Sequence, residues 1–228
     1  IKNIGMGCVA KLSKTLAHFY KDIRVDSLLC KPEKCNSVCL KYCPSFAISI
    51  DEESNKAKID TSKCLYCLHC RSVCSKAGIG AIKITWIKDY ELQALHYTEN
   101  ALGVVKSIGS EKFFYISLAI DITENCDCVS YTGRNIVPDI GILCSNDPVA
   151  IDQASIDLVN KEKGITGSKA EKLDENTDKF AYIYATPGKN VTKKNLTHIT
   201  MLKHAEKIGL GTRNYELLMV PKHKSNEN

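Results

Sequence analysis

The sequence CKPEKCNSVCLKYCP occupies residues 30–44, and CLYCLHCRSVCS follows at residues 64–75. These two cysteine runs hold eight of the twelve cysteines in the chain. The first run is spaced C-x4-C-x3-C-x3-C and ends in Cys43-Pro44, and the second is spaced C-x2-C-x2-C-x3-C and ends in Cys74-Ser75. The second spacing is one with which thiolates bind a cubane iron–sulfur cluster, so two such runs in tandem predict two [4Fe–4S] clusters.

A crossed set of ligands is expected for these clusters. Four thiolates must converge on a cubane from four directions, and three closely spaced cysteines on one turning loop can reach only three corners. In two-cluster ferredoxins the fourth corner comes from the other run. We therefore assign one cluster to Cys30, Cys35, Cys39 and Cys74. We assign the other cluster to Cys43, Cys64, Cys67 and Cys70.

The two runs belong to an internal repeat. Ala47-Ile48-Ser49-Ile50 follows the first run, and Ala81-Ile82-Lys83-Ile84 follows the second. Each half is expected to form a cysteine loop, a short helical turn and a β-strand, which gives an α+β module with pseudo-two-fold symmetry over residues 26–87. The module resembles a bacterial-type two-cluster ferredoxin. Its first run is also similar to the ferredoxin domain of the ribosome-recycling ATPase family (RNase L inhibitor), although no Walker motif follows, so the ATPase itself is not implied.

Two other chemistries compete for these cysteines. Structural zinc takes four thiolates per site, usually from two separated pairs. Disulfide frameworks occur mainly in small secreted chains. Triplets followed by Cys-Pro favour iron–sulfur ligation over both alternatives.

The composition limits the class of protein. The 228 residues are 44% hydrophobic and 25% charged, which is ordinary for a globular protein of one or two domains. No apolar run approaches the length of a membrane span, so no membrane insertion is expected. The net charge of +5 comes from scattered lysines, which disfavours nucleic acid and would suit an acidic redox partner protein. Reduced thiolates imply a reducing compartment, expected to be the cytoplasm of an anaerobic prokaryote.

Residues 1–25 and 88–228 are expected to form a discontinuous α/β core around the inserted ferredoxin-like module. Leucine and valine at helical spacing predict a helix over residues 88–109. The string GMGCVA at residues 5–10 matches a dinucleotide-binding fingerprint only weakly, because no strand is visible before it.

Further elements are expected after residue 109. The apolar runs at residues 113–122 and 136–144 predict two strands, the first of them fully buried. Asp147-Pro148 is suited to begin a helix, and another helix is expected over residues 195–211. The alternation of strand, loop and helix predicts a mixed, partly parallel sheet. Tyr215 to Val220 is expected to form a closing strand or docking segment.

Several strings spread over nearly the whole chain resemble the iron–sulfur family called domain of unknown function 362. They are IKNIGMGC from residue 1, DITENCDC from 121, VPDIGIL from 137, SNDPVAIDQASIDLVN from 145 and HAEKIGLGTRNYEL from 204. The resemblance implies two [4Fe–4S] clusters on an α/β core and names no reaction. Members of that family carry a further α/β stretch before the KNIGMG string, which this chain is expected to lack or to begin inside.

The remaining cysteines suggest a possible second site. Cys126 and Cys128 follow a predicted strand, and ligands commonly bind beyond the carboxyl ends of strands in open α/β sheets. One hypothesis is a metal or substrate site built from Cys126, Asp127, Cys128 and Cys8, which His18 and Cys144 would approach. The alternative is that Cys8 and Cys144 are small buried hydrophobes and that Asp147 only caps a helix. We favour that alternative for Cys144 and leave both open for the Cys126–Cys128 pair.

Three functions are compatible with these features. The first is an electron-transfer protein or subunit that passes electrons through two clusters to a redox partner. The second is an oxidoreductase whose clusters feed a site near Cys126–Cys128. The third is an interaction module in which the clusters are only structural. We rank them in this order, and the sequence does not determine the partner, the substrate or the oligomeric state.

Overall fold

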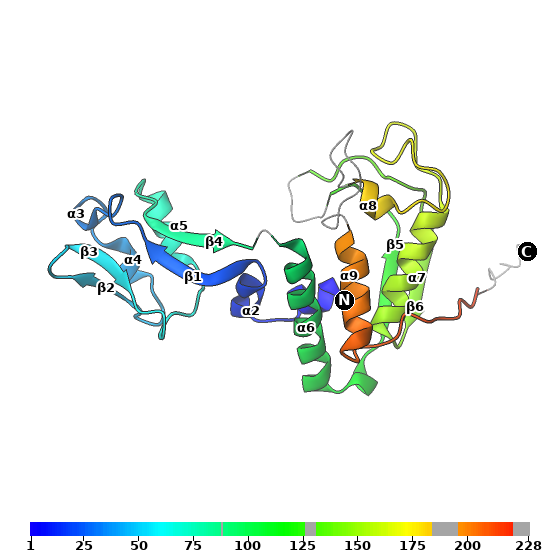
Figure 1. The fold of residues 1–228 in the computed structure, drawn as a ribbon, viewed down its shortest axis with the longest axis horizontal. Coiled ribbons are helices and arrows are strands. Elements are labelled where there is room, and N and C mark those ends of the chain that lie inside the picture. The colour runs from blue at the N-terminus through cyan, green and yellow to red at the C-terminus, as the bar shows by residue number, and fades with distance from the viewer. Residues whose placement is uncertain (88, 126–130, 184–195, 221–228) are drawn as a thin grey trace, which may run out of the picture. The chain divides into compact units, whose positions relative to one another are not determined.

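The computed structural model describes residues 1–87, 89–125, 131–183 and 196–220 (Figure 1). Contacts between residues divide the chain into two compact units. The cysteine-rich unit comprises Lys2–Asn100, and the C-terminal unit comprises Ile1 and Ala101–Asn228.

The cysteine-rich unit consists of short helices and strands that follow the sequence repeat. Its elements are α1 (Lys2–Gly7), α2 (Lys11–Leu16), β1 (Phe19–Val25), α3 (Pro32–Cys35), α4 (Val38–Lys41), β2 (Ile48–Asp51), β3 (Lys56–Ile59), α5 (His69–Lys76), β4 (Ile82–Trp86) and the first part of α6 (Tyr90–Ile108). The strands predicted after each cysteine run are β2 and β4. β2 pairs with β3, and β4 pairs with β1, in both cases antiparallel.

The core of this unit is built from cysteines and aliphatic side chains together. Its buried members are Ile23, Cys30, Cys39, Ile48, Ala57, Tyr66, Cys70, Cys74, Ala81 and Ile82. The strands therefore contribute an apolar surface, and the cysteine loops pack against it. β1 lies upstream of residue 26, where the sequence predicts that the module begins, and it still supplies Ile23 to this core.

In the C-terminal unit a helix packs on one face of a two-stranded sheet. Its further elements are η1 (Ser110–Lys112), β5 (Tyr115–Ala119), β6 (Gly141–Ser145), α7 (Pro148–Lys161), α8 (Lys179–Ile183) and α9 (Thr197–Lys207). The helix α7 packs on the sheet, and the Ser155 hydroxyl donates to the Ser117 hydroxyl at 3.0 Å. The unit is thus a mixture of helix and strand, as the sequence predicts.

The prediction of a partly parallel sheet is wrong for the described residues, because all three described sheets are antiparallel. β5 and β6 pair with Tyr115 opposite Ser145 and Ala119 opposite Gly141. A parallel pair needs a crossover connection, usually a helix, between its strands. Here the helix comes after the second strand, so the chain between β5 and β6 has only to reverse its direction.

The prediction of a fully buried strand over residues 113–122 is also wrong. Alternate residues of β5 face away from α7, so Ile116 is 63% exposed and Leu118 is 61% exposed. Cys144 lies opposite Ile116 in β6 and is exposed too, which contradicts its expected burial. Tyr215 to Val220 forms no strand, and Met219 is among its exposed side chains.

Lys179 is fully buried in the C-terminal unit. Its ammonium donates hydrogen bonds to the backbone carbonyl oxygens of Asn160, Asp174 and Thr177, at 3.0, 2.7 and 3.2 Å. These three bonds use all three donors of the ammonium group. Lys179 therefore ties the end of α7 to the turn that precedes α8.

Candidate functional site

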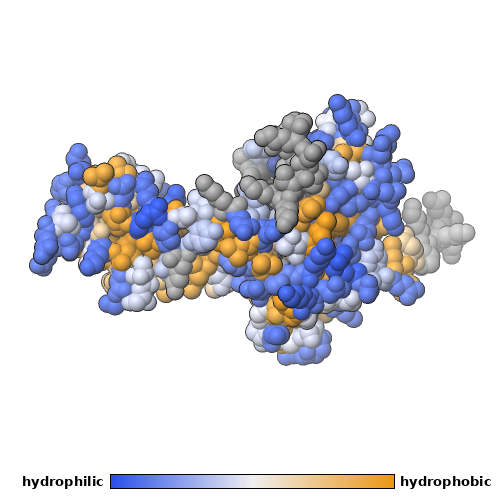
Figure 2. All heavy atoms as spheres, in the orientation of Figure 1, coloured by the Kyte–Doolittle hydropathy of each residue, from blue (hydrophilic) through white to orange (hydrophobic). Residues whose placement is uncertain are grey.

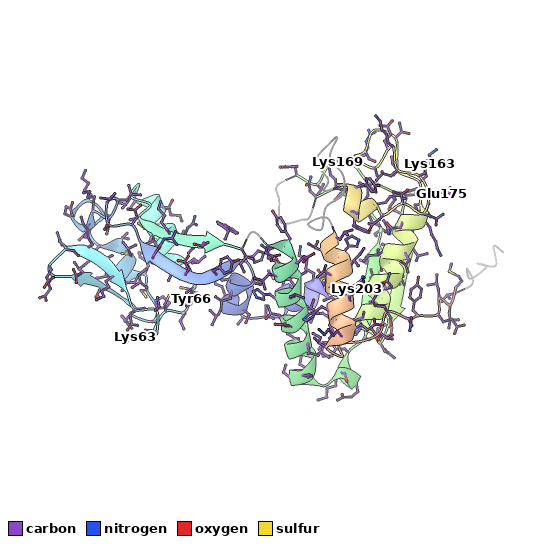
Figure 3. All side chains as sticks on the ribbon, viewed as in Figure 1. Lys63, Tyr66, Lys163, Lys169, Glu175 and Lys203 are labelled. Atoms are coloured by element: carbon purple, nitrogen blue, oxygen red, sulfur yellow. The ribbon has the colours of Figure 1, made fainter. Side chains whose placement is uncertain are left out.

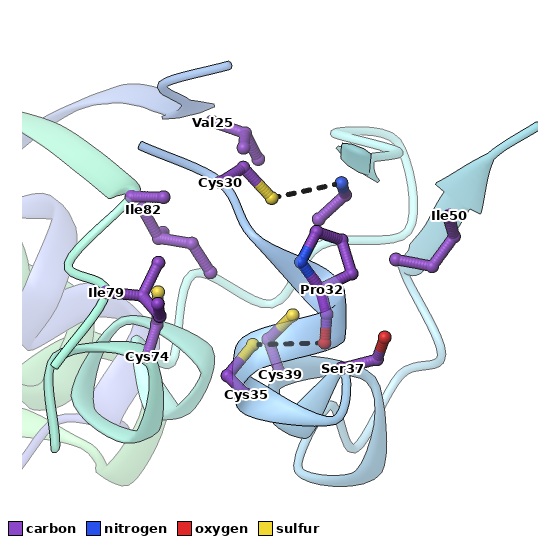
Figure 4. Close-up of a pocket in the computed structure, with 12 residues that line it drawn as sticks. Val25, Cys30, Pro32, Cys35, Ser37, Cys39, Ile50, Cys74, Ile79 and Ile82 are labelled. Atoms are coloured by element: carbon purple, nitrogen blue, oxygen red, sulfur yellow. Dashed lines mark hydrogen bonds between the residues drawn. The ribbon is translucent and has the colours of Figure 1, made fainter. Parts of the chain in front are cut away.

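Two cavities in the cysteine-rich unit are lined by cysteine. The first cavity is surrounded by residues from α3, α4, α5 and the strands β1, β2, β3 and β4 (Figure 4). Its cysteines are Cys30, Cys35, Cys39 and Cys74. Val25, Pro32, Ile50, Ile79 and Ile82 are among the apolar residues that complete the wall. Four thiols thus face one apolar space.

The second cavity has the same construction. Its cysteines are Cys43, Cys64, Cys67 and Cys70. Ile23, Ile48, Ile59, Leu65 and Leu68 supply most of the remaining wall. Each cavity therefore takes three cysteines from one run and a single cysteine, Cys74 or Cys43, from the other. This grouping is the same as in the crossed assignment, and the binding of clusters by these cysteines stays a prediction.

The strands connect the two cavities. In β2, Ile48 lines the second cavity and Ile50 lines the first. The paired strand β3 matches this order, because Ile59 lies opposite Ile48 and Ala57 lies opposite Ile50. Residues two apart on a strand share a face, so one strand serves both cavities. β1 does the same through Ile23 and Val25.

Tight turns direct the thiols inward. Asn36 and Ser37 adopt left-handed backbone conformations between Cys35 and Cys39, with φ of 51° and 49°. Tyr66 and Leu68 do so on either side of Cys67. Left-handed residues reverse the chain over a short distance, at a cost for any residue other than glycine. The cysteine loops are therefore conformationally specified.

Burial keeps some of these thiols neutral in the absence of a cation. Together with the neighbouring Cys74, Cys35 and Cys30, it raises the pKa of Cys39 to about 11. Burial also raises the pKa of Cys70 to about 12. A bound metal reverses this preference, because a coordinating thiol is deprotonated outright.

Backbone amides point at several sulfur atoms. The N–H groups of Ala57, Ala47 and Tyr66 donate to the Sγ atoms of Cys30, Cys43 and Cys64, at 3.4, 3.2 and 3.4 Å. Burial alone would raise the pKa of Cys43, but hydrogen bonds, that from Ala47 N–H foremost, outweigh burial and lower it. Such donors stabilise negative sulfur and are one of the means by which proteins tune an iron–sulfur group.

The cysteines around the cavities stand in two sets of four. Over residues 1–87, 89–125, 131–183 and 196–220, no three or more His, Cys, Asp or Glu side chains gather closely enough to hold a single metal ion. Eight of the ten described cysteines stand around the two cavities. Four thiols around one apolar space match the number and element of the ligands of a cubane.

The other predicted site residues lie in different parts of the chain. Cys126, Asp127 and Cys128 lie outside the described residues. Cys8 is exposed after α1 in the cysteine-rich unit, whereas Cys144 is exposed on β6 in the C-terminal unit.

Asp147 and His18 have local partners. Asp147 caps α7, because its Oδ1 accepts from the N–H groups of Val149 and Ala150 at 2.7 and 2.9 Å. This confirms the predicted cap. Its Oδ2 also accepts from Thr212 N–H at 2.8 Å. His18 Nε2 lies 3.2 Å from the Tyr97 hydroxyl.

Sequence reasoning missed the contribution of β1. Ile23 and Val25 line the two cavities, although they precede the first cysteine run. The signal was present in the sequence FYKDIRV, where apolar Ile23 and Val25 alternate with charged Asp22 and Arg24. The amide donors to sulfur could not be read from side-chain types, since any residue but proline offers an N–H.

Comparison with known proteins gives one match. The model of the family described as domain of unknown function (DUF362) matches residues 1–157. Neither the curated proteins nor the solved structures contain a match to this chain. Within the described residues, every helix is too short or too polar to cross a lipid bilayer.

Proposed function

This chain belongs to the DUF362 family, and from its two cysteine-lined cavities we propose that it is an electron-transfer protein or subunit that holds two [4Fe–4S] clusters. The family description assigns no activity, so the proposal rests on the cysteine-lined cavities. The supporting observation is the sorting of eight thiols into two sets of four, each around its own apolar space. In this proposal the cysteine-rich unit contains the ferredoxin-like module expected from the repeat.

A [4Fe–4S] group, when bound, accepts and releases one electron at a time. The chain would contribute three things. The four cysteines of each cavity hold the group as thiolates. Aliphatic side chains such as Ile50 and Ile48 exclude water from it. The amides of Ala57, Ala47 and Tyr66 stabilise the negative charge on three sulfur atoms.

Anaerobic reconstitution with iron and sulfide tests this proposal. About eight irons and about eight sulfides per chain are expected, because each cubane contains four of each. The protein should show a visible absorption band that dithionite bleaches and mild oxidation restores. Bound zinc without visible absorbance would refute the cofactor, and clusters that cannot be reduced reversibly would indicate a structural role instead.

A further inference from the structure

Phe46 occupies an unexpected position in the loop after Cys43. Its side chain is 85% exposed, and its backbone is left-handed with φ of 51°. That conformation costs a residue other than glycine roughly 1 kcal/mol. The internal repeat uses glycine at the matching place, because Gly80, with φ of 61°, precedes Ala81 as Phe46 precedes Ala47. The fold therefore accepts glycine here, and neither burial nor backbone geometry explains a phenylalanine.

Other exposed apolar side chains flank the second cavity. Tyr42 is exposed next to Cys43, and Leu65 is exposed next to Cys64 and lines the cavity itself. Figure 2 shows apolar surface among the hydrophilic residues of this unit. Exposed apolar groups that gather at one site mark an interaction surface more often than isolated ones do.

The loops around the second cavity carry the larger positive charge. Residues 41–46 and 60–73, which carry the four thiols of the second cavity, contain Lys41, Lys63 and Arg71 against Asp60, giving +3 − 1 = +2. Residues 26–39 and 74–76, which carry the four thiols of the first cavity, contain three lysines and two acidic residues, giving +3 − 2 = +1. Figure 3 labels Lys63 in the cysteine-rich unit, where its Nζ lies 3.6 Å from a carboxylate oxygen of Asp60.

The cysteines around the second cavity are less buried than those around the first. Three of its four cysteines are only half-buried, whereas three of the four cysteines of the first cavity are buried. Electron exchange between proteins requires the two redox groups to approach closely, so the more exposed group is the better exit.

We propose that Phe46, together with Tyr42 and Leu65, is the docking contact for an acidic electron-carrier protein, and that electrons leave the chain through the second cavity. This inference rests on the proposed function. In the exchange, one electron leaves the iron–sulfur group and the partner's redox group, such as a flavin, gains it, and no bond of the chain is made or broken. The basic loops attract the carboxylates that ring the partner's contact surface, while Phe46 fills its apolar centre.

Flavodoxin, an acidic flavin protein, is a suitable probe. The reconstituted full chain is reduced with dithionite, freed of excess reductant and mixed with oxidised flavodoxin in a stopped-flow instrument. Phe46→Gly should lower the rate constant and weaken flavodoxin binding, measured by calorimetry, each about tenfold, which corresponds to about 1.4 kcal/mol. Iron content and melting temperature should not fall, because the substitution restores the glycine of the repeat.

Two controls isolate the contact. Leu28→Ala removes a side chain that is 84% exposed and lies two residues before Cys30 in the sequence, and it should leave both flavodoxin measurements unchanged. Oxidation by ferricyanide, which needs no docking surface, should proceed at the same rate in wild type and Phe46→Gly. Raising the ionic strength should slow the reaction with flavodoxin, since the attraction between the proteins is screened.

The outcomes separate this inference from the proposed function. If ferricyanide oxidises the reduced protein but Phe46→Gly reacts with flavodoxin as fast as wild type, the docking contact is refuted and electron transfer stands. If the wild type reacts with ferricyanide but not with flavodoxin, the proposal of an acidic partner is refuted. It is also refuted if the rate of the reaction with flavodoxin does not depend on ionic strength. Loss of iron in Phe46→Gly would show that Phe46 stabilises the fold, and it would refute Phe46 as a docking contact. A reconstituted protein that cannot be reduced overturns the proposed function itself.

Discussion

Paired cysteine substitutions would reveal which thiols share an iron–sulfur group. Cys43 belongs to the first run in the sequence, yet it lines the second cavity with Cys64, while Cys35 lines the first. Cys43→Ala combined with Cys64→Ala therefore removes two ligands from one site. Cys43→Ala combined with Cys35→Ala removes one ligand from each of two sites.

The iron content should separate the two double variants. A site that keeps fewer than four thiolates is expected to lose its cubane on purification. Cys43→Ala with Cys64→Ala should then retain about four irons per chain, and Cys43→Ala with Cys35→Ala should retain almost none. Iron and sulfide analysis after anaerobic reconstitution measures this, and electron paramagnetic resonance of the reduced protein counts the remaining clusters.

The comparison has a matched design. Cys35 and Cys64 are both half-buried, so the two variants lose similar side chains. Circular dichroism checks that both fold. If each run instead supplied all four ligands to its own group, the two iron contents would be exchanged, and that result would refute the crossed arrangement. Equal iron contents would refute the existence of two separate sites.

Three further predictions concern the C-terminal unit. Lys179→Met should lower the free energy of unfolding by about 3 kcal/mol in urea titrations, because three backbone carbonyls lose the ammonium that donates to them. The exposed Lys172→Met should change it little, and similar losses in the two variants would contradict this role of Lys179. Asp147→Ala should lower the free energy of unfolding by about 1–2 kcal/mol because it removes the cap of α7, whereas Asp147→Asn should keep most of the stability. Thermal unfolding measures this, and equal stability of the two variants would contradict the capping role. Burial, together with a hydrogen bond to Asp157, raises the pKa of Tyr215 to about 12, above its unfolded value of about 10. The wild type should therefore be more stable than Tyr215→Phe below about pH 10, and this difference in stability should disappear as the pH rises to about 12. A difference in stability that does not depend on pH would contradict the shifted pKa of Tyr215.

The sequence was most informative where chemistry fixes the spacing. The cysteines stand in two sets of four around two cavities, the same sets that ligand spacing and the repeat predicted. The strands after each run, β2 and β4, were likewise predicted because Ala-Ile-x-Ile alternates after both runs. The Asp147 cap was readable from Asp-Pro alone, since both residues have strong positional preferences at a helix start.

The sequence was least informative about how strands pair. Hydrophobic runs show where β5 and β6 lie but carry no direction, so the alternation of strand and helix suggested parallel pairing where the structure is antiparallel. The prediction of buried side chains in these strands was wrong for a related reason. The side chains of Ile116, Leu118 and Cys144 are apolar, and only the packing of α7 against the opposite face of the sheet shows that they are left exposed.

The strands explain why two sites of this kind belong together in one unit. In β2, Ile50 faces the first cavity and Ile48 faces the second, about 7 Å apart along one face of the strand. The same step separates Val25 from Ile23 in β1, and the register between β2 and β3 repeats it. The spacing between the two cavities is therefore set by the strand repeat and not by the loops and short helices that carry the thiols. A one-residue insertion between Ile48 and Ile50 would turn one of them away from its cavity, so the strands have to keep their register for both sites to stay intact. Such a fixed spacing would suit the proposed electron exchange between two clusters, because the rate of that exchange would depend on the distance between them.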